Sequence, residues 1–436
     1  MKILKFGGTS VESTERIRKL AQLIQSDEPR IIVLSAMAGT TNSLEEITNL
    51  LYQAKKEEAN EKISNLEVKY QDRIEDLFAS QEYKSKGKEL ITSHFNYIRN
   101  FVFRSFTSLQ EKAILAQGEL ISTAMFHYYL SELKVDSVFL PALNFMRIDK
   151  DGEPDYFYIQ ENLKRELEQY TDQKLFITQG FICRNAYGEV DNLKRGGSDY
   201  TASIIGSVLQ STEVQIWTDI DGFHNNDPRF VANTSSLKQL SFEEAAELAY
   251  FGAKIMHPSS IMPCKLKNIP VRLKNTLHPT DDGTLISDDQ IGSGIKAIAA
   301  KDGITAVKVK SGRMLQAYGF LRKLFEVFEI YKTPIDMIAT SEVAVSLTID
   351  DNSNLPAIQS ELVKFGNVEI DENQSIICIV GDFISESSGS AKLVLEALEH
   401  IPLRMISYGG SKHNISVLVS QKDKIAALQA LSKHLF

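Results

Sequence analysis

The sequence predicts an α/β fold with a mainly parallel sheet, followed by smaller ferredoxin-like units. Short apolar strands alternate with loops and helical patterns from the N-terminus to about Ile286, which is typical of a parallel sheet covered on both faces. Glycine pairs follow strand-like segments at Gly7-Gly8 and Gly196-Gly197. Beyond Ile286 the periodicity changes, and a β-α-β-β-α order occurs twice. We therefore expect two or three domains.

Composition restricts the class of protein further. The chain has 436 residues, 43% of them hydrophobic, which is more than a single core usually supports. No apolar run approaches the roughly 20 residues that cross a membrane, and the N-terminus has no secretory pattern, so we expect a cytoplasmic protein without membrane contact. A net charge of −9 disfavours nonspecific nucleic-acid binding. Cys183, Cys264 and Cys378 are too widely spaced for a disulfide framework or a zinc cluster, and we expect them to be buried.

The elements of the parallel sheet follow in order along the chain. The predicted strands are Met1 to Phe6, Arg30 to Ser35, Ser137 to Leu140, Leu175 to Gln179 and Val214 to Thr218. Between Gly39 and Gly118 there is no proline, and charged residues alternate with apolar ones at helical spacing. This stretch predicts a long helical hairpin with a solvated charged face. Ligands of such sheets gather at the carboxyl ends of the strands, where both glycine pairs lie.

The C-terminal part is predicted to contain two interlocked repeats. After a polar linker at Asp288 to Ser293, the first repeat begins with a strand at Gly303 to Ser311, and the second begins with a strand at Ser375 to Phe383. The second copy ends without its last strand. Because Ile295 to Lys301 is an unassigned β-like segment, we infer that it supplies this missing strand.

The glycine pairs indicate phosphoryl transfer. Backbone N–H groups at a glycine-rich strand end, followed by a helix, can face a phosphate. Phosphoryl transfer needs positioning and cations more than covalent work from the protein, and Lys5 and Lys254 are candidate cations. Taken alone, each is more often an ordinary surface lysine. Neither the P-loop spacing nor a dinucleotide fingerprint explains the two loops.

Several longer motifs then occur in one order along the whole chain: KFGGTSV, SAMAGTTN, QGELIST, RGGSDYTA, IWTDIDGFHNNDPR, FGAKIMHP and TSEVAVSLTID. This series resembles the aspartokinases, most closely the single-function, lysine-sensitive class. The resemblance implies an amino-acid-kinase-type three-layer αβα sandwich with a mainly parallel sheet, plus C-terminal tandem ferredoxin-like (ACT) units. It assigns residues 1–290 to the catalytic domain, 303–374 to the first ACT unit, and 295–301 plus 375–436 to the second.

The implied reaction is the ATP-dependent phosphorylation of the side-chain carboxylate of L-aspartate, the first step toward lysine, threonine and methionine. By resemblance the catalytic residues are Lys5, Asp199 and Lys254, and the substrate-binding residues are Thr41, Glu119, Arg195 and Ser198. Chemically, Arg195 offers a fork for the α-carboxylate and Glu119 an acceptor for the α-ammonium. The structural alternatives are helix N-capping by Ser198 and Asp199 and an ordinary exposed helix charge at Glu119.

The resemblance also implies a nucleotide site. Its residues would be Lys5, Gly7, Gly8, Ser10, Thr218, Asp219, His224, Arg229, Lys254 and Ile255. His224 departs from the family, because a tyrosine usually stands there. Trp217 lies in an apolar strand and is expected in the core rather than against the base. Mg²⁺ is implied as the cofactor of ATP, with phosphate oxygens and water as its main ligands and no dedicated protein metal site.

Lysine is the expected effector, bound between two copies of the first repeat, and the implied assembly is a homodimer through the ACT units or a tetramer. The matching positions are Met314, Gly319, Phe320, Leu321, Ile335, Asp336, Ser341 and Glu342. Ala317 replaces a serine that is common in the family. The structural alternative is that Phe320 and Leu321 form the apolar face of a helix.

Two other functions stay open from sequence. The first is a sensor that binds an amino acid without turnover, and the second is a related kinase acting on another amino acid such as glutamate. Complete motif residues favour the kinase over the sensor, and the C-terminal repeats together with Thr41-Asn42 disfavour glutamate.

Overall fold

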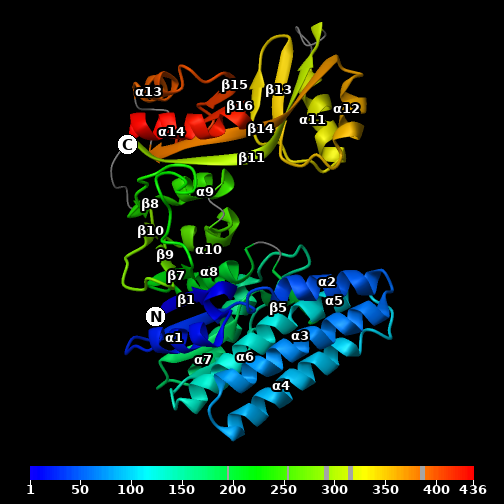
Figure 1. The fold of residues 1–436 in the computed structure, drawn as a ribbon, viewed down its shortest axis with the longest axis vertical. Helices are drawn as coiled ribbons and strands as arrows, with labels where there is room; N and C mark the ends of the chain where they lie inside the picture. Colours follow the sequence, from blue (N-terminus) through cyan, green and yellow to red (C-terminus); the bar gives the residue numbers. More distant parts are fainter. Residues whose placement is uncertain (194–195, 253–254, 289–293, 313–317, 383–387) are drawn as a thin grey trace. The chain divides into compact units, whose positions relative to one another are not determined.

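The computed structural model describes residues 1–193, 196–252, 255–288, 294–312, 318–382 and 388–436. The chain divides into two compact units (Figure 1). Unit 1 contains residues 1–223, 238–242 and 255–289, and unit 2 contains residues 224–237, 243–254 and 290–436. Residues 224–237 belong to unit 2 because they bond to its C-terminal part: the Ile298 amide donates to the carbonyl of Asn225, and the Asn226 side chain donates to the carbonyl of Leu428.

Unit 1 is built on an eight-stranded sheet with the order β3-β4-β2-β1-β7-β9-β10-β8. Its strands are β1 (Lys2–Phe6), β2 (Arg30–Leu34), β3 (Val138–Leu140), β4 (Leu175–Gln179), β7 (Glu213–Thr218), β8 (Gln239–Leu240), β9 (Val271–Asn275) and β10 (Thr284–Ile286). All neighbouring pairs are parallel except β9 with β10. The predicted mainly parallel sheet and its five predicted strands are confirmed.

Helices cover both faces of this sheet. Leu4 and Phe6 of β1 belong to a core shared with the helices α1 (Thr14–Leu23), α2 (Thr40–Tyr52), α3 (Lys56–Leu77), α4 (Gln81–Arg99) and α6 (Gln117–Glu132). Ile3, on the opposite face of the same strand, lies beside α8 (Gly197–Leu209). Because both faces are buried, the central strands carry consecutive buried apolar residues, as in Ile3-Leu4 of β1 and residues 31–34 of β2.

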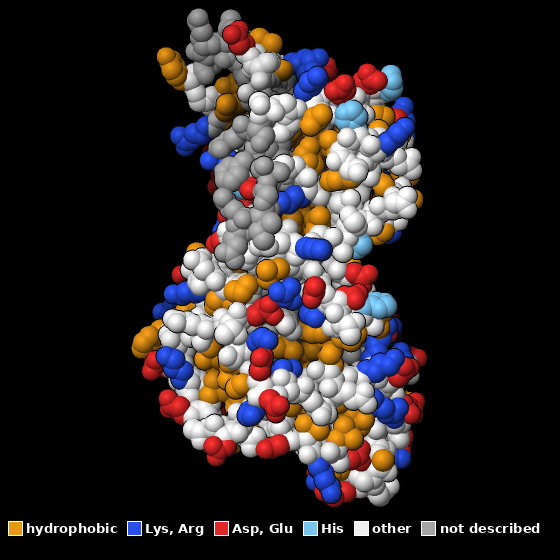
Figure 2. All heavy atoms as spheres, turned by 90° about the vertical axis from the view of Figure 1, so that its left-hand side faces the viewer, with side chains coloured by type: hydrophobic (Ala, Val, Ile, Leu, Met, Phe, Trp, Pro, Cys, Tyr) orange, Lys and Arg blue, Asp and Glu red, His pale blue; other side chains and the backbone are white. Residues whose placement is uncertain are grey.

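The predicted helical hairpin is present as α3 and α4, which lie side by side in unit 1 (Figure 1). Each helix buries one stripe of apolar residues, including Tyr70 and Ile74 on α3 and Phe95 on α4. The remaining faces carry exposed ion pairs such as Lys86 with Glu82. Figure 2 shows Lys and Arg side chains interspersed with Asp and Glu over one face of the molecule. Such exposed pairs contribute little to stability individually.

Unit 2 contains a six-stranded antiparallel sheet with the order β12-β13-β11-β14-β16-β15. Its strands are β11 (Gly294–Lys310), β12 (Ile338–Thr340), β13 (Ala344–Ile349), β14 (Asn367–Asp382), β15 (Leu403–Tyr408) and β16 (Asn414–Ser420). The helices α11 (Phe320–Ile330) and α12 (Leu355–Leu362) pack on one core of the unit, and α13 (Ser390–Ala397) and α14 (Lys424–Leu435) pack on the other.

The long strands β11 and β14 run through both repeats. The segment 294–301 pairs with residues 376–382, and the segment 306–310 pairs with residues 367–371 of the same partner strand. The sequence predicted a separate strand for each of these four segments. They join because Gly303 and Asn373, which look like turn residues, take positive φ values of 76° and 56° beside register shifts of the ladder. Such bulges bend a strand without ending it.

Other element predictions can be checked directly. Trp217 is 4% exposed and its ring stacks on Phe6 at 5.5 Å, which confirms its place in the core. The three cysteines are buried free thiols, as expected, and burial raises the pKa of both Cys183 and Cys264 to about 12. Among the described residues, no helix combines the length and the apolar character that spanning a membrane requires.

Candidate active site

The glycine-rich loop after β1 brings Lys5 to the carboxyl edge of the sheet. Lys5 is the penultimate residue of the strand, and the short 3₁₀ turn Gly8–Val11 follows it. The loop is tight: a Cβ atom on Gly8 would lie 2.8 Å from the carbonyl oxygen of Ala36. Only glycine allows this close approach, which leaves the loop backbone next to the loop that follows β2.

The Lys5 ammonium lies 2.6 Å from a carboxylate oxygen of Asp199, and both side chains are nearly buried. Asp199 is in the first turn of α8, whose N-cap residue is Gly196 in the left-handed conformation with φ of 63°. The N-cap position is a glycine, and no side chain of the described residues caps this helix, so the capping alternative for Ser198 and Asp199 is wrong. The structure therefore joins a strand-end cation to an anion at a helix N-terminus, where the helix dipole favours negative charge.

Glu119 is buried, and the alternative of an exposed helix charge is wrong. It lies in the first turn of α6 and is 5% exposed. One carboxylate oxygen accepts a hydrogen bond of 3.2 Å from the Ala36 amide. Burial raises the pKa of Glu119 to about 7, and this effect outweighs the opposing influences of that amide and of the Lys5 charge. A buried carboxyl group poised near neutral pH is a candidate for binding a ligand cation.

Ser198 is held by a residue that the sequence analysis did not single out. The Ser35 hydroxyl donates to the Ser198 hydroxyl at 2.9 Å, and the Ser122 hydroxyl donates to the Ser35 carbonyl at 2.8 Å. Ser35 is the first residue of the SAMAGTTN motif, so its place in the motif was the available signal. Thr41, the predicted pocket residue, is half-buried in the first turn of α2.

The nucleotide residues predicted in unit 1 lie at neighbouring strand ends. Gly7 donates its amide to the Trp217 carbonyl at the end of β7, directly before Thr218 and Asp219. The Thr218 hydroxyl donates to Asp219 at 3.1 Å. Ser10 is 1% exposed, and its hydroxyl is bonded to that of Thr276 at 2.9 Å. Ile255 is half-buried in unit 1.

The other predicted nucleotide residues belong to unit 2 or lie outside the described residues. His224 Nδ1 is 3.2 Å from the Thr234 hydroxyl. Arg229 is largely exposed, and its guanidinium donates to both carboxylate oxygens of Asp227, at 3.0 Å to Oδ1 and 2.6 Å to Oδ2. Arg195 and Lys254 lie outside the described residues.

The predicted effector positions lie in unit 2 around α11. Gly319 caps this helix in the left-handed conformation, Phe320 packs against Phe365, and Leu321 is 39% exposed, so the two apolar residues do not share one buried face. Ile335 is partly buried against the same core, Ser341 and Glu342 are exposed, and Met314 and Ala317 lie outside the described residues.

Among the described members of this group, Asp336 is the one whose side chain is withdrawn from solvent. Its side chain is fully buried, and its carboxylate accepts from the Tyr250 hydroxyl at 2.7 Å and from the Lys301 ammonium at 2.9 Å. Lys301 also pairs with Asp350 at 2.7 Å and lies over the Tyr250 ring. Burial and the Asp336 charge raise the pKa of Tyr250, so its hydroxyl stays a donor.

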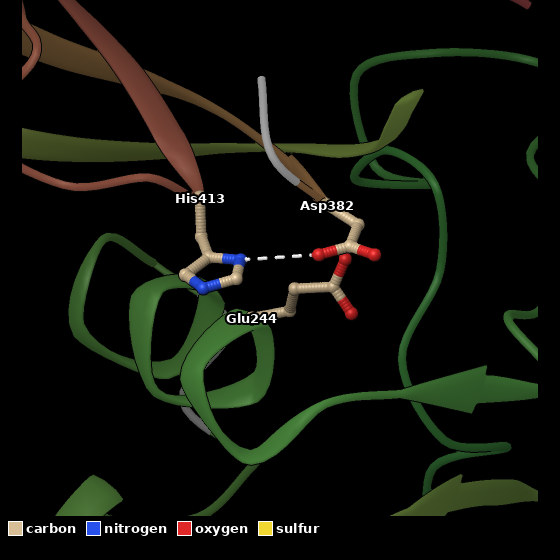
Figure 3. Close-up of side chains that lie close together, drawn as sticks. All are labelled: Glu244, Asp382 and His413. Carbon is tan, nitrogen blue, oxygen red and sulfur yellow. Dashed lines mark ion pairs between the residues drawn. The ribbon is translucent and has the colours of Figure 1, made fainter. Parts of the chain in front are cut away.

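Three side chains of types that can bind a metal ion lie close together elsewhere in unit 2 (Figure 3). Glu244 lies in the helix at Phe242–Tyr250, Asp382 ends β14 and His413 lies in the loop before β16, and their ligand atoms lie within 4.8 Å of one another. His413 Nδ1 is 3.7 Å from the Asp382 carboxylate, and the Lys296 ammonium is 2.8 Å from the fully buried Glu244 carboxylate. Because Lys296 already compensates the Glu244 charge, we interpret the group as a buried ionic network that joins α9 (Phe242–Tyr250) to the sheet of unit 2.

Comparisons with known proteins agree with this arrangement. Residues 1–275 match the amino acid kinase family, and residues 377–435 match an ACT domain. Lysine-sensitive aspartokinase 3 of Escherichia coli (strain K12) is 32% identical over 447 residues, which cover 100% of this chain and 99% of that protein. The chain belongs to the aspartokinases, within the amino acid kinase family.

Solved structures of E. coli aspartokinase III have the same fold. The complex with aspartate and ADP, in the R-state, aligns with a TM-score of 0.83 at 31% identity and covers 100% of both chains. The complex with lysine and aspartate, in the T-state, aligns with a TM-score of 0.84 at 31% identity and covers 100% of this chain and 99% of that chain.

Proposed function

We propose that this chain transfers the γ-phosphoryl group of ATP to the side-chain carboxylate of L-aspartate. An oxygen of that carboxylate bonds to the γ-phosphorus, while the bond from this phosphorus to the bridging oxygen breaks and its electron pair leaves with ADP. The product is 4-phospho-L-aspartate. A carboxylate with an ordinary pKa of about 3.9 is already ionised at neutral pH, so the acceptor needs no general base.

The observation that carries this proposal is the Lys5–Asp199 pair at the end of β1, beside the Gly7-Gly8 loop. Lys5 supplies a cation where charge develops on the moving phosphoryl group, and Asp199 holds the ammonium in place. The nucleotide is assigned to the loop residues Gly7 and Gly8, to Thr218 and Asp219, and to the further predicted contacts Ser10, His224, Arg229, Lys254 and Ile255.

The amino-acid substrate is assigned to the pocket around Glu119. Its buried carboxylate suits the α-ammonium group, Arg195 suits the α-carboxylate, and Ser198 and Thr41 complete the pocket. Mg²⁺ enters with ATP and reduces the charge repulsion between the phosphates and the acceptor. The nearby carboxylate of Asp199 is engaged by Lys5, which fits an ion held mainly by phosphate oxygens and water.

Regulation is assigned to unit 2. The E. coli relative that was solved with lysine supports lysine as the effector. We assign its site to the interface between two copies of the first repeat, residues 303–374, in a homodimer or a tetramer. Residues 295–301 and 375–436 form the second repeat. The catalytic domain is assigned to residues 1–290.

The test is ATP-dependent trapping of the acyl phosphate with hydroxylamine, using aspartate and then glutamate as the acceptor. We expect hydroxamate with aspartate only. Lys5→Ala should lower turnover by about 100- to 1,000-fold, because one such contact contributes about 2.7 to 4 kcal/mol to the transition state. Lys19→Ala is the matched control, since Lys19 is an exposed lysine paired only with Glu15 among the described contacts. No product from wild type would favour the sensor, and product with glutamate would favour the related kinase.

A further inference from the structure

The helical hairpin α3–α4 touches the candidate active site at three points. From α3, the Tyr70 hydroxyl is hydrogen bonded to the Thr40 hydroxyl at 2.8 Å. One turn further along, Arg73 donates to the Met37 sulfur at 3.7 Å. From α4, His94 Nδ1 lies 2.6 Å from the Gln117 side-chain oxygen. All three contacts reach residues next to the predicted substrate pocket, although the hairpin itself carries none of the predicted site residues.

The Tyr70–Thr40 bond is fully enclosed. Tyr70 is 0% exposed and Thr40 is 2% exposed, so water does not replace either partner. Burial raises the pKa of Tyr70 to about 12, and the nearby Glu119 charge acts in the same direction. The phenol is therefore neutral and keeps its hydrogen. A buried hydroxyl that loses its partner is costly, which makes this bond a firm constraint on Thr40.

Thr40 is the first residue of α2 and directly follows a loop, residues 35–39, that is hydrogen bonded to several site residues. The Ala36 amide donates to Glu119, and the Ala38 amide donates to the Gly8 carbonyl. The Ser35 hydroxyl donates to Ser198. The loop closes with Gly39 in the left-handed conformation and enters α2 at Thr40. Displacement of this loop would therefore disturb Glu119 and Ser198, the two predicted pocket residues to which it donates.

The contact from α4 has a defined direction. The Gln117 amide nitrogen donates to the Ala113 carbonyl at 2.8 Å, so its oxygen faces His94 and accepts from Nδ1–H. Burial lowers the pKa of His94, which favours the neutral imidazole, and the Gln117 oxygen selects the tautomer with its hydrogen on Nδ1. The hairpin thus also holds the first turn of α6, two residues before Glu119.

We infer that Tyr70 is a positioning residue of the amino-acid pocket, and that the hairpin α3–α4 sets the geometry with which this pocket receives the α-amino acid. This inference rests on the proposed aspartate kinase function. Tyr70 does not touch the reacting atoms; it acts through Thr40 and the loop 35–39 that precedes it. The role is specific to the amino acid, because the hairpin contacts lie on the side of Glu119 and Ser198, whereas Thr218 and Asp219 follow β7.

The test compares steady-state kinetics of wild type, Tyr70→Phe, Thr40→Val and the double variant. Tyr70→Phe keeps the buried ring and removes only the hydroxyl. We expect the KM for aspartate to rise about tenfold, the effect of a single buried hydrogen bond, while the KM for ATP changes less than about twofold. Thr40→Val should give a similar rise, and the double variant should be no worse than either single variant, because all three lack the same bond.

Tyr97→Phe is the matched control. It removes a hydroxyl from the same hairpin at a side chain that is 42% exposed and packs only against Phe101 among the described ring contacts. Both KM values should stay at wild-type levels. An unchanged KM for aspartate in Tyr70→Phe would overturn the inference, and so would a parallel rise of both KM values with a lowered melting temperature. Wild-type turnover of aspartate is measured first. Absence of this turnover would contradict the proposed function itself, whereas the variants test only the role of Tyr70.

Discussion

At the scale of single residues, Glu119 shows how burial sets chemistry. The protein raises the pKa of this carboxyl group from 4.5 to about 7 by removing it from water. Since the folded-state pKa is the higher one, the protonated group favours folding at low pH. That contribution is fully present below about pH 4.5 and is lost as the pH rises through about 7. Ionisation of Glu119 therefore lowers the stability of the folded protein, but only the ionised form can bind an ammonium group.

This conflict predicts a pH dependence of substrate binding. The KM for aspartate should fall as the pH rises from about 6 to about 8, because the fraction of ionised Glu119 increases over that range. Steady-state kinetics across this range, with ATP saturating, measures it. Glu119→Gln should raise the KM and remove this part of the pH profile. The same profile in the Gln variant would show that another group titrates and that Glu119 does not bind the ammonium.

The sequence identified Lys5, Asp199 and Glu119 because each stands in a motif with a strand or helix boundary beside it. It did not identify Tyr70, which reaches Thr40 across 30 positions of sequence. Helical periodicity places Tyr70 on the buried face of α3 but does not say which polar group meets its hydroxyl. Such partners depend on how helices pack, which pattern reasoning from one sequence does not reach.

At the scale of elements, Gly87 fixes how closely α3 and α4 pack. A Cβ atom at this position would lie 2.7 and 2.9 Å from two side-chain atoms of Ile74 and 3.2 Å from the Phe78 ring. Glycine within an exposed helix costs about 1 kcal/mol relative to alanine. Replacing Gly87 by alanine would recover that free energy, but the added methyl group would also crowd α3. Such overpacking costs about 1 to 3 kcal/mol.

We therefore expect Gly87→Ala to lower stability by up to about 2 kcal/mol, measured as the shift of the thermal or urea midpoint. Ile74→Val in the same chain should recover part of the loss, since it removes one of the two crowded methyl groups. Ser85→Ala, at an exposed position of the same helix, is the control and should leave stability equal or slightly higher. A Gly87→Ala variant that is more stable than the wild type would contradict this expectation, because it would mean that α3 and α4 move apart without a loss of free energy.

The same scale explains where strand prediction failed. Lys301-Asp302-Gly303 and Asn373 have the composition of turns, so the sequence predicted strand ends there. In the fold, neighbouring strands on both sides keep the chain extended: β11 lies between β13 and β14, and β14 lies between β11 and β16. Ladder bonds that continue beyond the turn-like residues convert them into bulges. The central apolar strands of unit 1 had no such conflict, and they were predicted correctly.

At the scale of the whole molecule, regulation requires that an effector in unit 2 changes catalysis in unit 1. Inhibition through a remote site is a coupling free energy between two binding events, typically about 1 to 3 kcal/mol, or 5- to 150-fold in affinity. Asp336 is the proposed acceptor for an ammonium group of lysine. Tyr250 and Lys301 both donate to one of its carboxylate oxygens, Oδ1, whereas the buried Oδ2 has no partner among the described residues and can accept from an incoming ammonium group.

Asp336→Asn should accordingly raise the lysine concentration for half-inhibition by about tenfold or more, while turnover without lysine stays near the wild-type value. The amide keeps the size of the side chain but removes the charge that attracts an ammonium group. Inhibition curves at saturating aspartate, together with calorimetric binding of lysine, separate lost binding from lost coupling. Glu369 is an exposed carboxylate of unit 2 that is paired with Lys310. Glu369→Gln is therefore the control, and lysine should inhibit this variant as it inhibits the wild type. Undiminished inhibition of Asp336→Asn, or a wild type that lysine does not inhibit, would remove Asp336 from the effector site.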